Sequence, residues 1–573
     1  MKTTYKTYWG PNSFCRRPCV VFRFEDVSGD EMSRMTFSCV EVARYLNRHF
    51  RFPNSYDRKG SICWNDVLDF LSNAAVFVLN YVRGDLDESG FVADENGAIV
   101  FVEFHQPELV IKAIRILLNV LFRFSPSKER EYTSALNAFW DECHGRHPDF
   151  QAHALIAAAK SKNIYYTNLG RKIWLYGMGS NGNVFFETST IDDLKNGIET
   201  DKVSGKAIFN AVGAPTARYQ VVRDHSDLMS AIRKIGFPCA IKPVHAGRGN
   251  GVTANIRTLK EVEFAFAEAS RFCKKSHDIM VEEFVPGRDY RLLFVRGDFV
   301  GCASSVAPFV IGDGIRSIRK LIDDINSART RNLYQSGYLR PIKVDDSVIE
   351  TLSVQNLGLD SILQSGQKVI LRRNTNLGGG GVTEFYDKVH PDVLAIAARI
   401  ARHSGLHSVG IDYITENINS SPSLSGGKFT ELNKVPGVPL FLAAGYDITN
   451  LGKRFLGDDI GNIDVNLFIF NKDDLRKFLE SYSGEYAILT PDIVVKRGKS
   501  LKIPNGNFRE LLNKVLLDRT LHSLDIIAHL NFVEEFGFPT EFLSKVFVGK
   551  SCNTKMVCST IERLDCTVEY AIS

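Results

Sequence analysis

The sequence predicts a multidomain α/β protein, of the α+β kind in which sheets and helices mix within separate domains. Three observations carry this prediction. The chain has 573 residues, which is too long for one hydrophobic core. Short apolar strands alternate with helical patterns over most of its length. The pattern also changes near residues 161 and 456, which divides the chain into domains over residues 1–160, 161–455 and 456–573.

The composition is that of a globular protein without a membrane or nucleic-acid signal. The net charge of +4 is small against 70 basic and 66 acidic residues, so nothing favours a nucleic-acid partner. The most apolar stretch, residues 109–124, carries Lys112, Arg115 and Arg123, which favours a core helix over a membrane span. The N-terminus has no apolar signal core, and the eleven cysteines lack pair-of-pairs metal spacing. We expect free thiols in a cytoplasmic protein without a membrane partner. The sequence leaves the oligomeric state open, a homo-oligomer included.

The first domain, residues 1–160, reads as a mixture of strands and helices. Residues 20–24 and 98–103 have the apolar pattern of strands. Apolar residues recur at helical spacing over residues 41–47, 64–79 and 109–124.

A hairpin is predicted where the second domain begins. Residues 173–176 and 184–186 read as strands, and Gly177-x-Gly179-x-x-Gly182 lies between them. This spacing imitates a dinucleotide-binding fingerprint, but a strand follows it where that fingerprint needs a helix. We therefore interpret the glycines as a hairpin turn.

The rest of the second domain alternates helices and strands, and the third domain reads as a small α/β unit. Predicted helices cover residues 192–212, 226–235, 259–273 and 318–332, and predicted strands cover 218–222, 239–243, 252–256 and 279–284. After residue 461 the sequence predicts a strand at 467–470 and helices at 472–480, 508–518 and 523–530.

Two short segments deliver oxygen ligands from predicted strands. Asp412 follows the apolar alternation of Val409-Gly410-Ile411, and Glu431-Leu432-Asn433 places Glu431 and Asn433 two residues apart. Residues two apart on a strand point to the same face. Carboxylate and amide oxygens suit Mg²⁺, which proteins hold with one or two carboxylates plus substrate phosphates. The pattern therefore predicts an ATP-using enzyme.

A lysine and a glycine-rich loop precede these acids. Lys242 ends an apolar strand, and Gly247, Gly249 and Gly251 follow it. Glycines let backbone N–H groups approach phosphate oxygens, and lysine supplies a positive charge, although a simple turn explains the same residues. The segment from Glu282 through Val285 to Asp289 offers a connector for adenine and a carboxylate for ribose, and it also reads as an ordinary strand-turn-strand.

The order of these features resembles the ATP-grasp superfamily. Lys202, Lys242 with the glycines, Glu282 to Asp289, Asp412 and Glu431-x-Asn433 follow one another in the order typical of that fold. Further motifs look like the cyanophycin synthetase family, patchily over residues 1–160 and densely from residue 200, so that the likeness covers roughly residues 1–455. These motifs are Gly10-Pro11-Asn12, Leu169-Gly170, Val310-Ile311-Gly312-Asp313-Gly314, Leu371-Arg372-Arg373-Asn374-Thr375-Asn376, Val389-His390-Pro391 and Pro436-Gly437.

The resemblance implies a nucleotide site, a metal site and a reaction. ATP would be the nucleotide, and two Mg²⁺ ions would accompany it. A lid at about residues 207–290 would close over the site. The product would be an amide bond, made on an amino acid or short peptide through an acyl phosphate. The implied roles are phosphate binding by Lys202 and Lys242, adenine binding by Glu282 and Val285, ribose binding by Asp289, metal binding by Asp412, Glu431 and Asn433, and stabilisation of the reacting groups by Arg372 with Asn374 and Asn376 beside it.

The sequence also departs from this family in three places. Gly378 to Gly381 replace a serine-threonine pair, and Val438-Pro439-Leu440-Phe441-Leu442 replace a basic segment that contains histidine, which predicts a different and more apolar substrate. No second phosphate loop follows residue 460, so polymerisation with two amino acids is not expected. Two alternatives stay open: a degenerate ATP-binding scaffold, and an ATP-grasp phosphotransferase that makes no amide bond.

Overall fold

The computed structural model describes most of the chain. The described residues are 1–53, 56, 62–94, 97–170, 172–191, 193, 202–247, 249–273, 278–331, 339–372, 380–482, 486–489, 493–496, 499–502 and 508–570. Two compact units emerge from the contacts within the chain. Unit 1 joins Met1–Val184 to Leu456–Ser573, and unit 2 is Phe185–Phe455. The division into three domains stays a prediction beside these two units.

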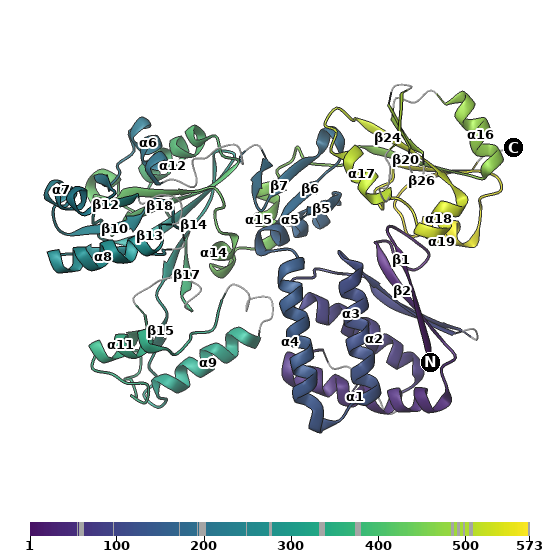
Figure 1. The fold of residues 1–573 in the computed structure, drawn as a ribbon, viewed down its shortest axis with the longest axis horizontal. Coiled ribbons are helices and arrows are strands. Elements are labelled where there is room, and N and C mark those ends of the chain that lie inside the picture. Colours follow the sequence, from purple (N-terminus) through teal and green to yellow (C-terminus); the bar gives the residue numbers. More distant parts are fainter. Residues whose placement is uncertain are drawn as a thin grey trace. The chain divides into compact units, whose positions relative to one another are not determined.

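The N-terminal part of unit 1 is an antiparallel sheet packed against helices (Figure 1). Apolar side chains of β2, such as Val20 and Phe22, are buried in the same core as the helices. Helix α1 begins with a capping box between Ser28 and Glu31, which satisfies the free N–H groups of its first turn. The predicted strands and helices are confirmed with longer bounds. The sheet order is β1 (Lys2–Tyr8), β2 (Cys19–Glu25), β4 (Gly97–Glu103), β3 (Ser89–Asp94), and the helices are α1 (Gly29–Phe50), α2 (Trp64–Asn80), α3 (Pro107–Arg123), η2 (Pro126–Lys128), α4 (Glu129–Arg146) and α5 (Phe150–Ser161).

The predicted hairpin is confirmed, and its glycines have a steric reason. β6 (Ile173–Tyr176) and β7 (Asn183–Phe186) are hydrogen-bonded neighbours, with η3 (Gly179–Asn181) between them in the chain. β5 (Tyr166–Gly170) pairs with the other edge of β6, and β8 (Ser189–Thr190) pairs with β7. Gly177 and Gly179 have φ of 78° and 53°. A Cβ on Gly179 would lie 2.3 Å from the carbonyl oxygen of Leu521. The glycines are therefore needed for close backbone packing inside unit 1.

The C-terminal part of unit 1 corrects one prediction. Residues 523–530 were expected as a helix, but Ser523–His529 form the strand β24, which pairs in parallel with β20 and β21. Leu524, Ile526, Ile527 and Ala528 are buried, and a short apolar run of this kind is ambiguous between strand and helix. The sheet order is β23 (Lys499–Lys502), β22 (Ile493–Lys496), β21 (Tyr486–Leu489), β24 (Ser523–His529), β20 (Asp464–Phe470), β25 (Lys545–Val548), β26 (Thr567–Tyr570), with helices α16 (Lys472–Ser481), α17 (Phe508–Leu516), α18 (Leu530–Phe536) and α19 (Lys555–Ile561).

Unit 2 contains a small sheet with two helices on one face, at the position predicted for the lid. Cys239 and Ile241 of β10 are buried with the helices, so Lys242 lies on the opposite face. The predicted strands and helices of this region are confirmed within a few residues. The sheet order is β11 (Thr253–Ile256), β10 (Cys239–Pro243), β12 (Ile279–Glu283), β9 (Tyr219–Val222), with helices α7 (His225–Ile235) and α8 (Leu259–Arg271).

The larger sheet of unit 2 is antiparallel, and helix α12 (Pro391–Ser404) covers one of its faces. Ile411 and Tyr413 of β18 share a core with Ala397 and Ile400 of that helix. The alternate residues of the strand, Asp412 among them, therefore belong to the other face. The sheet order is β17 (Val382–Tyr386), β14 (Asp298–Val306), β13 (Arg288–Val295), β18 (Ser408–Thr415), β19 (Lys428–Asn433).

The remaining elements of unit 2 flank these two sheets. Helix α6 (Lys202–Ala211) contacts β19, and an insertion between β14 and β17 has its own core. The insertion holds β15 (Phe309–Ile311), α9 (Ile318–Arg331), α11 (Asp346–Val354) and β16 (Lys368–Ile370), and the last helices are α13 (Pro422–Ser425), α14 (Val438–Ala443) and α15 (Ile448–Leu456). Across the described residues of both units, no helix is long and apolar enough to cross a bilayer.

Candidate active site

Three adjacent strands bring the predicted metal ligands to one face of the larger sheet. Asp412 of β18 lies opposite Arg291 of β13 on one side and Glu431 of β19 on the other. Asn433 lies opposite Gly410 in the same ladder, and its Nδ2 donates to Asp412 Oδ2 at 3.1 Å. The register thus gathers Asp412, Glu431 and Asn433, as the two-residue spacing predicts.

Arg291 is a member of this cluster that the sequence reading missed. Its Nε and Nη2 donate to the two carboxylate oxygens of Asp412, the latter over 3.0 Å, and its Nη1 donates to the Pro436 carbonyl at 3.0 Å. Such a two-point contact fixes a carboxylate in orientation as well as position. The signal was present, because Arg291 follows Asp289 by two residues on a predicted strand.

Gly410 leaves the space that the Arg291 side chain uses. A Cβ at this position would lie 2.6 Å from Cδ of Arg291 and 3.1 Å from Cα of Pro436. We expect Gly410→Ala to displace Arg291 and with it Asp412, lowering kcat about 10- to 100-fold, since small misplacements of reacting groups have effects of this size. Steady-state ATP turnover measures it. Gly358→Ala, where a Cβ meets no atom within 4 Å, is the control and should keep wild-type kcat. A Gly410→Ala enzyme of normal kcat would contradict the role given to Arg291.

Two lysines and a glutamate form a buried charged group at the smaller sheet. Lys242 Nζ lies 2.5 Å from Glu282 Oε1, and Lys206 Nζ lies 3.2 Å from Glu282 Oε2. Lys206 is fully buried and also donates to Thr216 Oγ1 at 2.9 Å. Lys206 was missed in the sequence, although it follows Lys202 by four residues and so shares its helix face.

Lys202 links the glycine loop to the acidic face. Its Nζ donates to the carbonyl oxygens of Val244 at 3.4 Å and Ala246 at 2.5 Å, and lies 3.6 Å from Glu431 Oε1. Beyond Ala246, Gly249 and Gly251 have φ of 73° and 69°, which favours glycine. Added Cβ atoms at Gly247 and Gly249 would meet open space. The loop is therefore open at Gly247 and Gly249, whereas a Cβ on Gly251 would lie 2.9 Å from the ring of Phe272.

The predicted nucleotide contacts are only partly reflected in these side chains. The carboxylate of Glu282 is occupied by Lys206 and Lys242, so its expected contact with adenine stays a prediction, as does that of the half-buried Val285. Asp289 shares the face of Arg291, two residues along β13. Its ribose-binding role stays a prediction as well.

Arg372 lies with the insertion and contacts none of the acids above in the described structure. Its Nη2 donates to Asp345 Oδ2 at 2.6 Å and to the Lys343 carbonyl at 2.8 Å, while its buried Nε has no hydrogen-bond partner among the residues that the structure describes. Asn374 and Asn376 lie outside the described residues.

Part of the glycine run that follows has a structural reason. Gly378 and Gly379 are outside the described residues, but Gly380 has φ of 89°. A Cβ on Gly380 would lie 2.8 Å from Cα of Ile342, and its carbonyl accepts from Arg329 Nη1 at 2.8 Å. Glycine at 380 is therefore required by the backbone.

The apolar run after Gly437 is mainly core. Val438, Phe441 and Leu442 are buried, and the ring of Phe441 lies 5.5 Å from that of Tyr446 in an edge-to-face arrangement. The interpretation of this run as a surface facing an apolar substrate is therefore wrong for these three residues. Apolar side chains on a helix of this kind are explained by packing alone.

The electrostatics of the site follow from its crowded charges. Burial raises the pKa of Asp412, and Arg291 opposes that rise. Loss of solvation together with the charge of Asp412 raises the pKa of Asp289 to about 7. Burial lowers the pKa of Lys202 and Lys206. The acids thus repel one another, and an added cation would relieve this repulsion.

The donor set fits a magnesium ion by its chemistry. Asp412, Glu431 and Asn433 offer carboxylate and amide oxygens, the hard ligands that Mg²⁺ takes together with nucleotide phosphates. Among the described residues, no group of three or more His, Cys, Asp and Glu side chains is placed to hold a metal ion. A site built here would therefore depend on the Asn433 amide and on phosphate oxygens to complete it.

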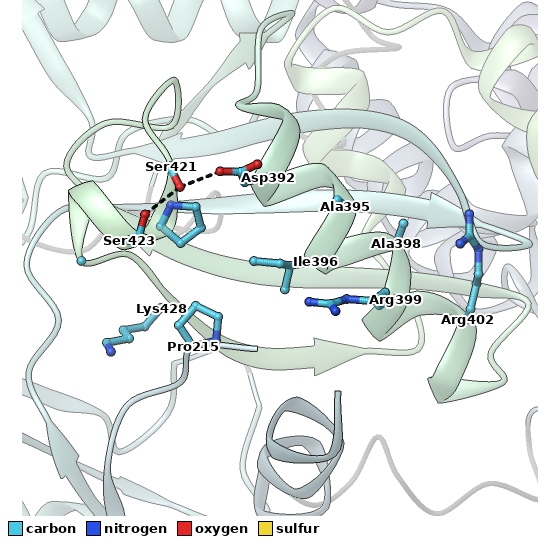
Figure 2. A pocket seen from close by; sticks show the side chains of 12 residues that line it. Pro215, Asp392, Ala395, Ile396, Ala398, Arg399, Arg402, Ser421, Ser423 and Lys428 are labelled. Atoms are coloured by element: carbon cyan, nitrogen blue, oxygen red, sulfur yellow. Dashed lines mark hydrogen bonds between the residues drawn. The ribbon is translucent and has the colours of Figure 1, made fainter. Parts of the chain in front are cut away.

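A separate hollow of about 1030 Å³ lies beside α12 (Figure 2). Figure 2 shows Ile396 and Arg399 of α12 facing Pro215 and Lys428 across it, and Ser421 Oγ donating to Asp392 Oδ2 at 2.7 Å. Helix α12 covers the opposite face of the sheet from Asp412. This hollow is therefore not the site of the acidic cluster.

The comparisons with known proteins name the fold. Residues 207–298 match the ATP-grasp domain, and the chain therefore contains an ATP-grasp domain and has the ATP-grasp fold that the sequence predicts. The chain resembles cyanophycin synthetase: it is 37% identical to that of Crocosphaera subtropica over 245 residues, which are 42% of this chain and 28% of that protein.

The chain is also similar to two proteins of glutathione biosynthesis. The chain is 32% identical over 183 residues, or 31% of its length, to the bifunctional glutathione biosynthesis protein of Clostridium perfringens, of which this is 22%. A crystal structure of a bifunctional glutathione synthetase from Pasteurella multocida aligns with a TM-score of 0.42 and 18% identity, over 61% of this chain and 52% of that one. The chain spans about a third or less of these curated relatives. The matched cyanophycin synthetase stretch is also shorter than the expected residues 1–455.

Proposed function

We propose that this chain is an ATP-dependent, ADP-forming carboxylate–amine ligase that acts on an amino acid or short peptide through an acyl phosphate. One observation carries the proposal: Arg291, Asp412, Glu431 and Asn433 share one sheet face, and Lys202 links Glu431 to the glycine loop of the ATP-grasp domain. Opposite charges around one place suit the handling of a polyphosphate and its metal ions. The eleven free cysteines support a reducing compartment, and we place the enzyme in the cytoplasm.

Magnesium, in one or two ions, would be held by Asp412, Glu431 and Asn433, and would supply charge neutralisation on the transferring phosphoryl group. Arg291 holds Asp412 in a fixed orientation for this purpose. Lys202 and Lys242 would bind nucleotide phosphates, and the smaller sheet would exclude water that could hydrolyse an acyl phosphate. The carboxylate substrate attacks the γ-phosphate, ADP leaves, and the amine then displaces inorganic phosphate from the acyl phosphate.

ATP consumption tests the proposal directly. The full chain is incubated with ATP and Mg²⁺ and with pools of the twenty amino acids and short peptides, and phosphate release and product mass are read together. Phosphate release with a condensed mass is the expected result. A phosphorylated product formed without an amine would instead identify a phosphotransferase. ATP binding without turnover in every pool would contradict ligation of these substrates and favour a scaffold.

Arg372 provides a second test, of the reacting step alone. We expect Arg372→Ala to lower kcat about 100-fold or more, since a group that stabilises transition-state charge has effects of that size. The Kd for ATP should change by less than about threefold, because the proposed charge partner is absent from the ground state. Stopped-flow and equilibrium nucleotide binding give the two values. Asp345→Asn, which leaves the arginine but loosens its anchor, should give an intermediate kcat. Equal losses in kcat and affinity would assign Arg372 to ground-state binding.

A further inference from the structure

Unit 1 contains a cavity of about 340 Å³ that the proposed ligase reaction does not use. Its lining comes from the residues just before β2, from the segment between β4 and α3, and from the β5–β6 hairpin. Helix α17 and Glu541 line it from the C-terminal part. Segments far apart in the sequence therefore build it together. Its size is that of a small-molecule site, at the lower end of the usual range.

The lining is unusual because charges of both signs face the same space. Three arginines and four glutamates line the cavity, together with Trp9 and Trp174. The side chain of Glu103 is only 3% exposed, and that of Arg17 is 18% exposed. Buried charges are costly unless they are paired, so a cavity with this lining needs a reason.

The opposite charges in this cavity lie near one another without forming direct hydrogen bonds. Arg17 Nε lies 3.7 Å from Glu103 Oε1, and Arg17 Nη1 lies 3.8 Å from Glu541 Oε1, both beyond hydrogen-bond length. The one hydrogen bond recorded for the Arg17 side chain among the described residues is from Nη1 to the Tyr166 hydroxyl at 3.1 Å. Arg509, with Nη1 bonded to the Trp9 carbonyl at 2.9 Å, adds a second cation. Arg17 and Glu541 thus keep donors and acceptors for a further molecule.

The second carboxylate oxygen of Glu103 has hydrogen-bond donors of its own. Glu103 Oε2 accepts from the N–H groups of Asp87 and Glu88 at 2.7 and 2.9 Å, which fixes the carboxylate in place. Burial opposes the charge on Arg17, but Tyr166, Glu541 and Glu103 raise its pKa. Arg17 is therefore a permanent cation, and its environment is preorganised.

We propose that this cavity binds a free α-amino acid as a zwitterion, with its carboxylate on Arg17 and Arg509 and its ammonium on Glu541. A ligand with both charges can hydrogen-bond to Arg17 and to Glu541 at once. A simple anion can bind only the arginine, and a simple cation only the glutamate. The aromatic side chains Trp9 and Trp174 give the ligand's side chain an apolar wall. The site is separate in its residues from the ATP-grasp cluster and does not depend on the ligase proposal.

Calorimetric titration of the full chain without nucleotide tests this site. Each of the twenty amino acids is titrated to about 10 mM, and we expect at least one to bind with a Kd near or below about 1 mM. The N-acetyl derivative and the carboxamide of that amino acid should each bind at least tenfold more weakly. Glu541→Gln should weaken binding at least tenfold, while the matched surface variant Glu562→Gln should bind as the wild type does.

Glu431→Gln separates this site from binding in the ATP-grasp domain. Binding at the proposed site should be unchanged by Glu431→Gln and weakened at least tenfold by Glu541→Gln, with the melting temperatures of both variants close to that of the wild type. The proposal is overturned if no amino acid binds the wild type, or if the only binding detected survives Glu541→Gln. Tighter binding of a dipeptide than of every free amino acid would also overturn it, in favour of a peptide terminus as the ligand.

Discussion

Glu431→Gln is expected to abolish nearly all ATP turnover and to leave the fold intact. The carboxylate contributes to the shared acidic face, and its one recorded charged contact within the described structure is Lys202 at 3.6 Å. Its side chain is 33% exposed, and the buried Lys202 that loses this carboxylate keeps its hydrogen bonds to the carbonyls of Val244 and Ala246. Weakened metal and phosphate binding should lower kcat on the order of 10²- to 10³-fold, the usual range for loss of one electrostatic contact at a reacting centre.

The measurement is ATP turnover across Mg²⁺ concentrations, with thermal unfolding recorded in parallel. Glu416→Gln, an exposed carboxylate on the loop after β18, is the matched control and should turn over normally. Asp412→Asn should be as inactive, but it also removes the partner of Arg291, so its melting temperature is expected to fall. Wild-type activity in Glu431→Gln would remove Glu431 from the metal site.

Glu282→Gln is expected to destabilise unit 2 strongly. The substitution leaves Lys206 and Lys242 buried without the carboxylate that now lies between them, at 3.2 and 2.5 Å. Breaking a buried ion pair by removal of one partner costs about 3–5 kcal/mol, because the remaining charge has neither water nor a partner. The two lysines also lower the pKa of Glu282, against the effect of burial, so the charged form is the one present near neutral pH.

Chemical denaturation followed by circular dichroism gives the free energy of unfolding. All four tryptophans of the chain belong to unit 1, so their fluorescence follows the unfolding of that unit separately. Glu283→Gln is the adjacent control, since Glu283 pairs with the exposed Arg218 at 2.8 Å and a surface pair contributes about 1 kcal/mol or less. Bound ATP should restore part of the loss in Glu282→Gln if the lysines meet phosphate. A Glu282→Gln protein as stable as the Glu283→Gln protein would show that this charged group contributes little to the fold.

The shared face of Glu431 and Asn433 could be predicted because it depends on local periodicity. Glu431 and Asn433 had to share a face. The sequence made an antiparallel pairing of β18 with β19 plausible, but it did not give the register of that pairing. Arg291 was missed because its contact with Asp412 does not depend on local periodicity. It depends on pairing between strands about 120 residues apart in the chain. Lys206 was hidden because a lysine in a helix is usually exposed, and only tertiary contacts bury it.

Errors in the fold came from segments whose surroundings decide their state. Residues 523–530 have an apolar run that fits a helix or a central parallel strand, and the sheet of unit 1 selects the strand. The run after Gly437 looked like a substrate surface, but Val438 and Phe441 are buried in α14. The periodicity of a sequence shows which side chains share a face of a helix or strand, but it does not show which distant part of the chain packs against that face.

The contacts within unit 1 bear on how this protein is made. The N–H of Trp9 donates to the Phe536 carbonyl at 3.0 Å, and the N–H of Phe538 donates to the Pro11 carbonyl at 2.7 Å. A Cβ on Gly10 would lie 1.8 Å from the carbonyl oxygen of Phe538, so the two strands of chain meet closely. During translation, residues 9–11 leave the ribosome on the order of a minute before their partners, at typical elongation rates. All of unit 2 emerges in that interval and is free to fold before residues 9–11 meet their partners, so these residues stay accessible to chaperones until then.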